Sequence, residues 1–207
     1  MAQRLALTII MAALAARGEI LDRIAVTVGK QVISESDVIL DLRVSAFLDQ
    51  KPVDLSGAEK RKAADRLVDQ LLILQDAAVA RVPLPSAGEA APLLAQVKAQ
   101  YGTEAEYRAA LARYHIAEAE LADHLLAGLR GMHFTDLRFR PEIQLSEDEL
   151  REFYNTFANP APAPAFEESR GRVEKLLTDQ RVLQALDRWL GTARTSIRIL
   201  YREQVFK

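Results

Sequence analysis

The three histidines are the first residues to consider for chemistry, because a neutral imidazole is a common metal ligand and general base. His115, His124 and His133 are spaced nine residues apart. Nine residues are ~2.5 turns of a helix, so neighbouring histidines of one helix would lie on opposite faces. The His-x-x-x-His pattern of helical metal sites is absent. The spacing therefore favours turn and surface positions, and we predict no metal site and no cofactor.

Acidic clusters are the second candidate for chemistry, since paired carboxyl groups can act as a general acid and a general base. They occur at Glu35 and Asp37, at 147–149, and at Glu167 and Glu168. Each cluster lies where a helix is expected to begin, and carboxylates there interact favourably with the positive end of the helix dipole. A catalytic pair would also need surroundings that drive the two pKa values apart. Helix starts explain these clusters, so no catalytic residue is predicted.

Other signatures of catalysis or nucleic-acid binding are missing from the sequence. There is no Gly-x-Ser-x-Gly, P-loop or dinucleotide-binding motif. Cysteine is absent, which excludes disulfides, thiol catalysis and a cysteine-anchored lipid. Arg130, Arg138 and Arg140 beside Phe134 and Phe139 are too few for a nucleic-acid-binding stripe, and the formal charge of −2 adds no bulk attraction. Function must therefore be sought in surface and shape.

The elements that must position such a surface are mainly helices. Of 207 residues, 49% are hydrophobic and only 6% aromatic, and the abundant alanine, leucine, glutamate and arginine favour helices. The capping-box pattern occurs at Ser56 with Glu59, Ser86 with Glu89, Thr103 with Glu106, and Ser146 with Glu149. We expect helices over about 35–48, 58–80, 87–100, 104–114, 118–132, 146–157 and 166–191, with Pro92 delaying the regular part of the third.

The second of these helices has the widest apolar face. Leu67, Leu71, Leu74 and Ala78 form one stripe, and Val68, Leu72 and Val79 lie beside it. A face of this width is typical of a central helix that other elements contact from several sides.

Strands are expected near both ends of the chain. "ILDRIAVTVGKQVIS" (20–34) alternates apolar and polar residues, and Gly29 with Lys30 fits a two-residue hairpin turn. "SIRILYR" (196–202) alternates in the same way. Because short strands are not stable alone, we predict that both ends pair in one small sheet. The predicted fold class is mainly α, a helical core with a small β-sheet formed by the N-terminal hairpin and the C-terminal strand.

The N-terminal segment has the features of an export signal. In "MAQRLALTIIMAALAARGE", Arg4 precedes an apolar stretch that ends in the Ala-x-Ala pattern of residues 13–15. The stretch is shorter than the ~20 residues that a membrane-spanning helix needs. We expect a signal peptide over 1–15 and no stable membrane insertion; the alternative is a first helix packed on the core.

Between the sixth and seventh predicted helices lies "ANPAPAPA", whose prolines exclude both helix and strand. Seven residues of extended, polyproline-like chain would span ~20 Å and act as a semi-rigid strap. The alternative is an ordinary loop that is rich in proline.

The order of these segments resembles the SurA family of periplasmic chaperones. The resemblance rests on "LDRIAVTVGKQVISESDV" (21–38), "RLVDQLLILQDAAV" (66–79), "LSEDELREFYNTF" (145–157) and "FEESRGRVEKLLTDQRVLQALDRWLGTARTSIRI" (166–199). Typical members carry one or two parvulin-type prolyl isomerase domains between the last two segments, where this chain has only the proline run. The resemblance thus implies an N-terminal helical domain over 16–158, a linker over 159–165 in place of the isomerase domain, and a segment over 166–207 that completes the same domain.

The same resemblance implies a function. It is that of an ATP-independent periplasmic holdase for unfolded exported polypeptides, above all outer-membrane proteins, without isomerase activity. The alternatives are a relative of the parvulin isomerases with residual or no activity, and a periplasmic adaptor for one specific partner. The residues proposed for client contact are Tyr107, Leu111 and Tyr114, which share one helix face, and Tyr101, Met132 and Phe134 near them. The alternative role for each is to fill the core.

Overall fold

The computed structural model describes residues 22–157 and 164–207. Within them the chain is mainly helical with one small antiparallel sheet, which confirms the predicted fold class. The predicted signal peptide (1–15) and most of the predicted linker (159–165) lie outside the described residues. The strands are β1 (Ile24–Val28), β2 (Gln31–Ser34) and β3 (Ile199–Tyr201), and the helices are α1 (Glu35–Leu48), α2 (Gly57–Val79), α3 (Ala87–Lys98), α4 (Glu104–Tyr114), α5 (Glu118–Phe139), α6 (Glu147–Phe157) and α7 (Phe166–Ser196).

The sheet joins the two ends of the described chain, as predicted. Its strand order is β2-β1-β3, with Val28 opposite Gln31 in the hairpin and Val26 opposite Tyr201 in the closing pair. Gly29 opens the two-residue turn with φ of +57°, a conformation that glycine adopts without strain. Its amide donates to the carbonyl of Arg198 at 2.9 Å, so the hairpin turn also binds the C-terminal segment.

The predicted N-caps all lie at helix starts. At Ser56 and Thr103 the hydroxyl accepts from the backbone amide of the glutamate three residues later. At Ser86 and Ser146 the serine amide donates to the glutamate carboxylate. Both arrangements satisfy amides that the helix itself leaves unpaired. The contacts are 3.4 Å for Ser56 with Glu59, 2.9 Å for Ser86 with Glu89, 3.2 Å for Thr103 with Glu106, and 2.9 Å for Ser146 with Glu149.

Helix α5 is longer than the sequence pattern indicates. Instead of ending near residue 132 it continues to Phe139, because that ring is buried against Trp189 with centroids 6.3 Å apart. Directly after it, Arg140–Glu142 form a 3-10 turn (η1), in which the proline occupies an early helical position that its missing amide does not disturb.

Helix α7 also exceeds its prediction. It continues through Gly191 to Ser196, because Arg194 is anchored to α2 by a hydrogen bond from Nε to Asp69 at 2.8 Å. The last turn is therefore held by tertiary contacts that no local pattern reveals.

The expected delay in α3 is wrong as well. The helix is regular from Ala87 and contains Pro92. Pro92 lies in the second turn, where its missing amide removes a single backbone bond, and the helix packs against α5.

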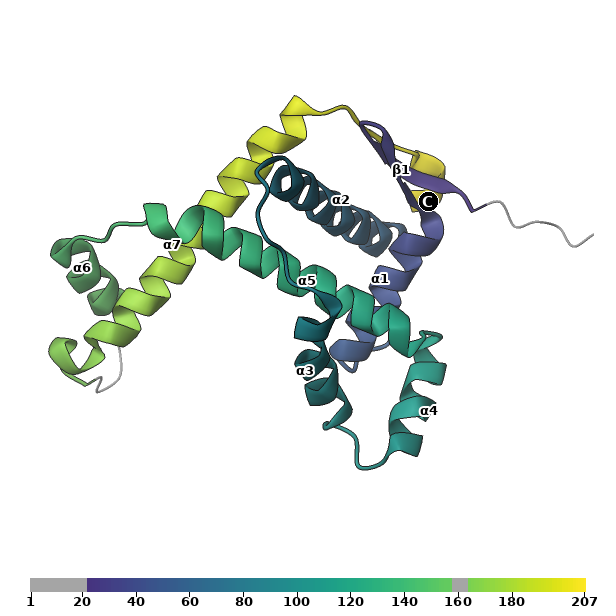
Figure 1. Cartoon of the computed structure of the whole chain (residues 1–207), viewed down its shortest axis with the longest axis horizontal. Coiled ribbons are helices and arrows are strands. Elements are labelled where there is room, and N and C mark those ends of the chain that lie inside the picture. The colour runs from purple at the N-terminus through teal and green to yellow at the C-terminus, as the bar shows by residue number, and fades with distance from the viewer. Residues whose placement is uncertain (1–21, 158–163) are drawn as a thin grey trace, which may run out of the picture.

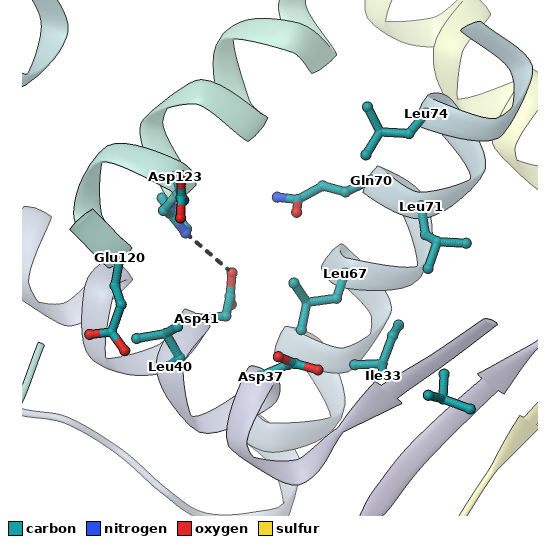
Figure 2. Close-up of a pocket in the computed structure, with 12 residues that line it drawn as sticks. Ile33, Asp37, Leu40, Asp41, Leu67, Gln70, Leu71, Leu74, Glu120 and Asp123 are labelled. Atoms are coloured by element: carbon teal, nitrogen blue, oxygen red, sulfur yellow. Dashed lines mark ion pairs between the residues drawn. The ribbon is translucent and has the colours of Figure 1, made fainter. Parts of the chain in front are cut away.

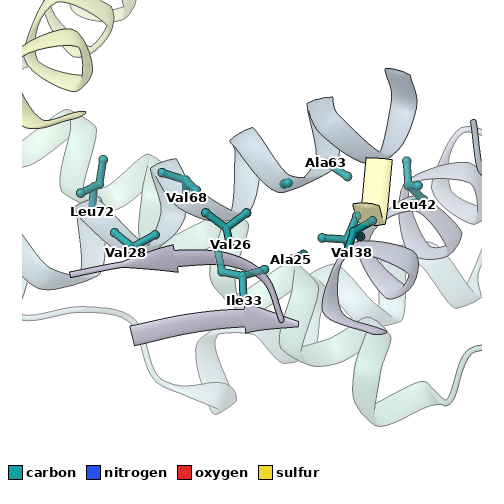
Figure 3. Packing of buried hydrophobic residues seen from close by; sticks show 11 residues of the cluster. Ala25, Val26, Val28, Ile33, Val38, Leu42, Ala63, Val68 and Leu72 are labelled. Atoms are coloured by element: carbon teal, nitrogen blue, oxygen red, sulfur yellow. The ribbon is translucent and has the colours of Figure 1, made fainter. Parts of the chain in front are cut away.

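The helices and the sheet bury four clusters of apolar side chains. The largest lies between the sheet, α1 and α2, and includes Val26, Val28, Val38 and Val68 (Figure 3). A second cluster joins α1, α3, α4 and α5, a third joins α2, α5 and α7, and a fourth lies between α6 and α7. The small residues Ala63, Ala64 and Ala77 are fully buried and allow close approach to that face of α2.

In space, α7 forms one long diagonal that connects two ends of the molecule (Figure 1). Its first half packs with α6 in a helical hairpin, and its last turns lie near the sheet and α2. Helices α3 and α4 both extend below α5 in this view and are joined by a loop at their lower ends. Among the described residues, no helix is both long and apolar enough to cross a membrane.

Candidate functional site

An open apolar groove lies between α1, α2, α5 and strand β2. It encloses about 340 Å³, and its apolar walls are formed by Val32, Ile33, Leu40, Leu67, Leu71 and Leu74. Figure 2 shows the three α2 leucines on one side and the α1 and α5 side chains on the other. We refer to this pocket as the α1–α2–α5 groove.

The groove exists because α2 is apolar on two faces. The stripe that the sequence singles out, Leu67, Leu71, Leu74 and Ala78, is not the buried one. The buried face is the neighbouring one, whose members are Ala63, Ala64, Val68, Leu72, Ile73 and Ala77. The alanines let the sheet and α7 approach that face closely, so the leucine stripe is left along the groove, with Leu74 37% exposed. A second hollow shares Val32, Leu71 and Leu74 with the groove and extends it along α2 to Ala78.

The opposite wall of the groove is acidic. Asp37 and Asp41 come from α1, and Glu120 and Asp123 come from α5. Among the described residues, no lysine or arginine lines the groove itself, whereas Lys30 lines its extension along α2. Two of the acids also cap their helices: the Ser34 amide donates to Asp37 at 2.8 Å, and the Ala117 amide donates to Glu120 at 2.6 Å.

Asp41 is the most unusual of the four acids, because its side chain is only 2% exposed. Arg66 pairs with its Oδ2 atom, whereas Oδ1 has no hydrogen-bond partner among the described residues. His124 Nδ1 lies 3.8 Å from Oδ1, beyond hydrogen-bond distance. Burial lowers the pKa of His124; Asp41 opposes this change and Arg66 adds to it. The imidazole is therefore neutral at neutral pH, and Oδ1 remains an unfilled acceptor.

The histidine predictions are thus only partly correct. His115 lies at the end of α4 with φ of +54°, a turn position as expected. The prediction is wrong for His124, which lines the groove beside Asp41. No sequence spacing links Asp41 to His124, because their proximity depends on how α1 packs against α5. Within the described residues, no group of histidine and acidic side chains is arranged to hold a metal ion.

Most of the predicted client-contact residues lie in the interior. Tyr107, Leu111 and Tyr114 do share one face, but all three are buried in the cluster around Phe47, and Tyr101 packs against that cluster. The Phe47 ring centroid lies 5.9 Å from that of Tyr101 and 5.6 Å from that of Tyr114. In this conformation these side chains pack between helices, which is the alternative role given for each of them.

The two remaining predicted residues lie on different sides of α5. Phe134 is fully buried and belongs to the cluster between α2, α5 and α7. Met132 is 59% exposed and lines a hollow of about 480 Å³ between α5 and α7, together with Leu183 and Leu186. Of the predicted residues, Met132 is the one that the structure leaves mostly exposed.

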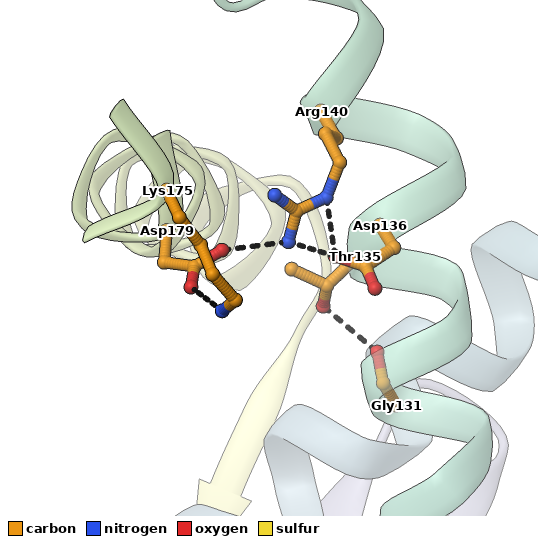
Figure 4. Close-up of polar contacts among 6 residues, drawn as sticks. All are labelled: Gly131, Thr135, Asp136, Arg140, Lys175 and Asp179. Carbon is orange, nitrogen blue, oxygen red and sulfur yellow. Dashed lines mark hydrogen bonds and ion pairs between the residues drawn. The ribbon is translucent and has the colours of Figure 1, made fainter. Parts of the chain in front are cut away.

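The polar groups of the hollow between α5 and α7 are balanced in charge (Figure 4). Arg140 donates to Asp179 at 2.9 Å and to Asp136 at 2.8 Å, and Lys175 donates to the second oxygen of Asp179 at 2.7 Å. Each cation therefore has a carboxylate partner. The hollow between α5 and α7 therefore lacks the acidic excess of the α1–α2–α5 groove.

No protein-family model matches the sequence, and no curated protein matches it either.

Proposed function

We propose that this chain is an ATP-independent chaperone that holds unfolded exported polypeptides, and that the α1–α2–α5 groove is its client site. The observation that carries the proposal is the leucine stripe of α2, which lies along an open groove with Leu67 and Leu71 only partly buried against the core and Leu74 exposed. Large apolar side chains gathered in an open hollow are typical of surfaces that bind other polypeptides.

The periplasmic setting in the proposal rests on the sequence of the first fifteen residues and on the resemblance to the SurA family. A separate part of the proposal is that no isomerase domain lies between α6 and α7, and the contacts between these two helices support it. Tyr154 of α6 donates to the carbonyl of Pro164 at 2.7 Å, and its ring lies 5.5 Å from that of Phe166 at the start of α7. The two helix ends are thus held side by side, so a short linker is sufficient between them.

The test is to dilute an unfolded outer-membrane β-barrel protein out of denaturant and to follow its aggregation by light scattering. We expect suppression near an equimolar ratio. Leu74→Ser should weaken this suppression because it removes an apolar contact in the groove. Leu55→Ser is the matched control, since Leu55 is 45% exposed but lies outside the groove.

Two outcomes would contradict the proposal. Unchanged scattering across a large excess of the protein would exclude a general holdase and favour an adaptor for one specific partner. Turnover of a proline-containing peptide in an isomerase assay would favour the enzyme alternative.

A further inference from the structure

The charge of the groove indicates which unfolded segments it prefers. We infer that the α1–α2–α5 groove selects apolar segments that carry a lysine or arginine, so that the cation lies on the acidic wall and the apolar side chains lie on α2. This inference rests on the proposed function of the groove and specifies its client.

The first argument is the separation of the two walls. Leu67, Leu71 and Leu74 project from α2, while Asp41 and Asp123 lie across from them on α1 and α5 (Figure 2). A segment lying between these walls meets the leucines and the Gln70 amide on one side and carboxylates on the other. A lysine or arginine among leucine-like residues matches both walls, because its stem is apolar and its head is charged.

The second argument is that the acidic wall has unfilled acceptors. Asp123 makes no hydrogen bond or ion pair with any described residue. The buried Oδ1 atom of Asp41 also lacks a hydrogen-bond partner in the described chain, and leaving a buried acceptor unsatisfied is unfavourable. An ammonium group has three donors and a guanidinium has five, so either can satisfy several acceptors together.

The third argument concerns the cations that are already present. Arg66 pairs with Asp41 through Oδ2, and it lines a separate hollow on the far side together with Asp49 and Asp54. His124 faces Oδ1 from the groove side and is neutral at neutral pH because burial lowers its pKa. The protein's own cations therefore leave the groove side of the acidic wall open to a cation from the client.

The test uses fluorescence anisotropy with three labelled leucine-rich peptides that differ at one central position, which is lysine, glutamine or glutamate. We expect the lysine peptide to bind roughly 5-fold more tightly than the glutamine peptide, since a partly exposed ion pair contributes up to about 1 kcal/mol. The glutamate peptide should bind most weakly. The preference for lysine should shrink as salt is added, because salt screens exposed charges.

Two variants test whether the acidic wall of the groove causes the preference for lysine. Asp123→Asn should reduce the ratio of lysine to glutamine affinity, and the protein should stay folded because this side chain is exposed and unpaired among the described residues. Asp187→Asn removes the same charge from an exposed position on α7, outside the groove, and should leave the ratio unchanged. Equal effects of the two variants would overturn the inference.

Failure of the inference alone and failure of the proposed client site give different results. If the lysine and glutamine peptides bind equally and Leu74→Ser weakens both, the groove is a client site without a preference for cations, and only the inference is wrong. If none of the peptides binds while the protein still suppresses aggregation, the groove is not the client site, and the inference and that part of the proposed function are both wrong.

Discussion

Arg194 on α7 donates from Nε to Oδ1 of Asp69 on α2 at 2.8 Å, across 125 residues of sequence. The same guanidinium donates to the carbonyl of Asp65 at 3.0 Å, and the Asp65 carboxylate accepts from the Tyr201 hydroxyl at 2.5 Å. The hydrogen bond to Asp69 is the main cause that raises the pKa of Arg194, and burial is the main cause that raises the pKa of Tyr201 to about 12. These contacts connect α2, α7 and β3.

We expect Arg194→Ala to lower the free energy of unfolding by about 2 kcal/mol, because it removes hydrogen bonds made by a charged group in a partly buried position. Urea denaturation followed by circular dichroism measures this change. Arg188→Ala is the matched control, since Arg188 is exposed on the same helix and its side chain has no partner among the described residues. Similar losses in both variants would mean that the contacts of Arg194 contribute no specific stability.

The C-terminal end of the chain lies directly against the start of α2. A Cβ atom at Gly57 would lie 1.9 Å from the carbonyl oxygen of Phe206, which is far inside van der Waals contact. Gly57→Ala should therefore displace the last residues and destabilise the protein, although alanine is the better helix former. The expected signs are a lower denaturation midpoint and faster hydrogen exchange at 199–206.

A second glycine provides the opposite expectation. Gly191 lies inside α7, and a Cβ atom there would meet nothing within 4 Å in the described structure. Gly191→Ala should stabilise the protein by up to about 1 kcal/mol through helix propensity alone. If both alanine variants were stabilising, the close contact between Gly57 and Phe206 would not exist in solution.

The sequence was sufficient for the fold class because local signals and periodicity agreed. The Gly29 turn, the serine and threonine caps and the alternating ends predicted the helices and the sheet with most of their boundaries. The ends of α5 and α7 were missed because Trp189 and Asp69 stabilise them through tertiary contacts. Such contacts leave no periodic trace in the sequence.

The candidate site was less predictable than the fold. An apolar stripe on α2 was visible in the sequence, but which of its two apolar faces becomes buried depends on how closely neighbouring elements approach Ala63, Ala64 and Ala77. The helical spacing of Tyr107 and Tyr114 leaves a client surface and a core role open, and the structure packs both rings around Phe47. Spacing shows that residues share a face; it does not show which element covers that face.

The stability of the protein should decrease on acidification because of His124. Burial lowers the pKa of His124 below its value in the unfolded chain, although Asp41 opposes this change. Arg66, Glu120 and Asp123 are the other charged groups around it. Between the two pKa values the unfolded state binds more protons, so the free energy of unfolding rises with pH. The stability that comes from keeping His124 neutral is fully present above the pKa of ~6.5 in the unfolded chain. It is lost as the pH falls through the lower pKa of His124 in the folded protein.

Urea denaturation of the protein and of His124→Gln between pH 5 and pH 8 measures this contribution. We expect a flatter dependence on pH for the variant, because glutamine does not titrate. His115→Gln is the control, since it removes an exposed histidine at the end of α4, and equal flattening in both variants would show that the effect is not specific to His124. A steeper loss of stability at low pH in His124→Gln would contradict the assigned direction of the pKa change.

Substitution of Phe134 distinguishes a role in the core from a role in client binding. Its ring is fully buried, with its centroid 5.4 Å from that of Trp189, the single tryptophan of the chain. Phe134→Ala should lower the free energy of unfolding by about 3–5 kcal/mol, because it leaves a cavity. It should also shift the emission of Trp189 to longer wavelength as water approaches the indole. Met132→Ala, two residues earlier and exposed, should change neither quantity appreciably. If Phe134→Ala kept full stability and native emission but weakened the suppression of aggregation, Phe134 would contact clients directly, and the interior position would not represent the working state of the protein.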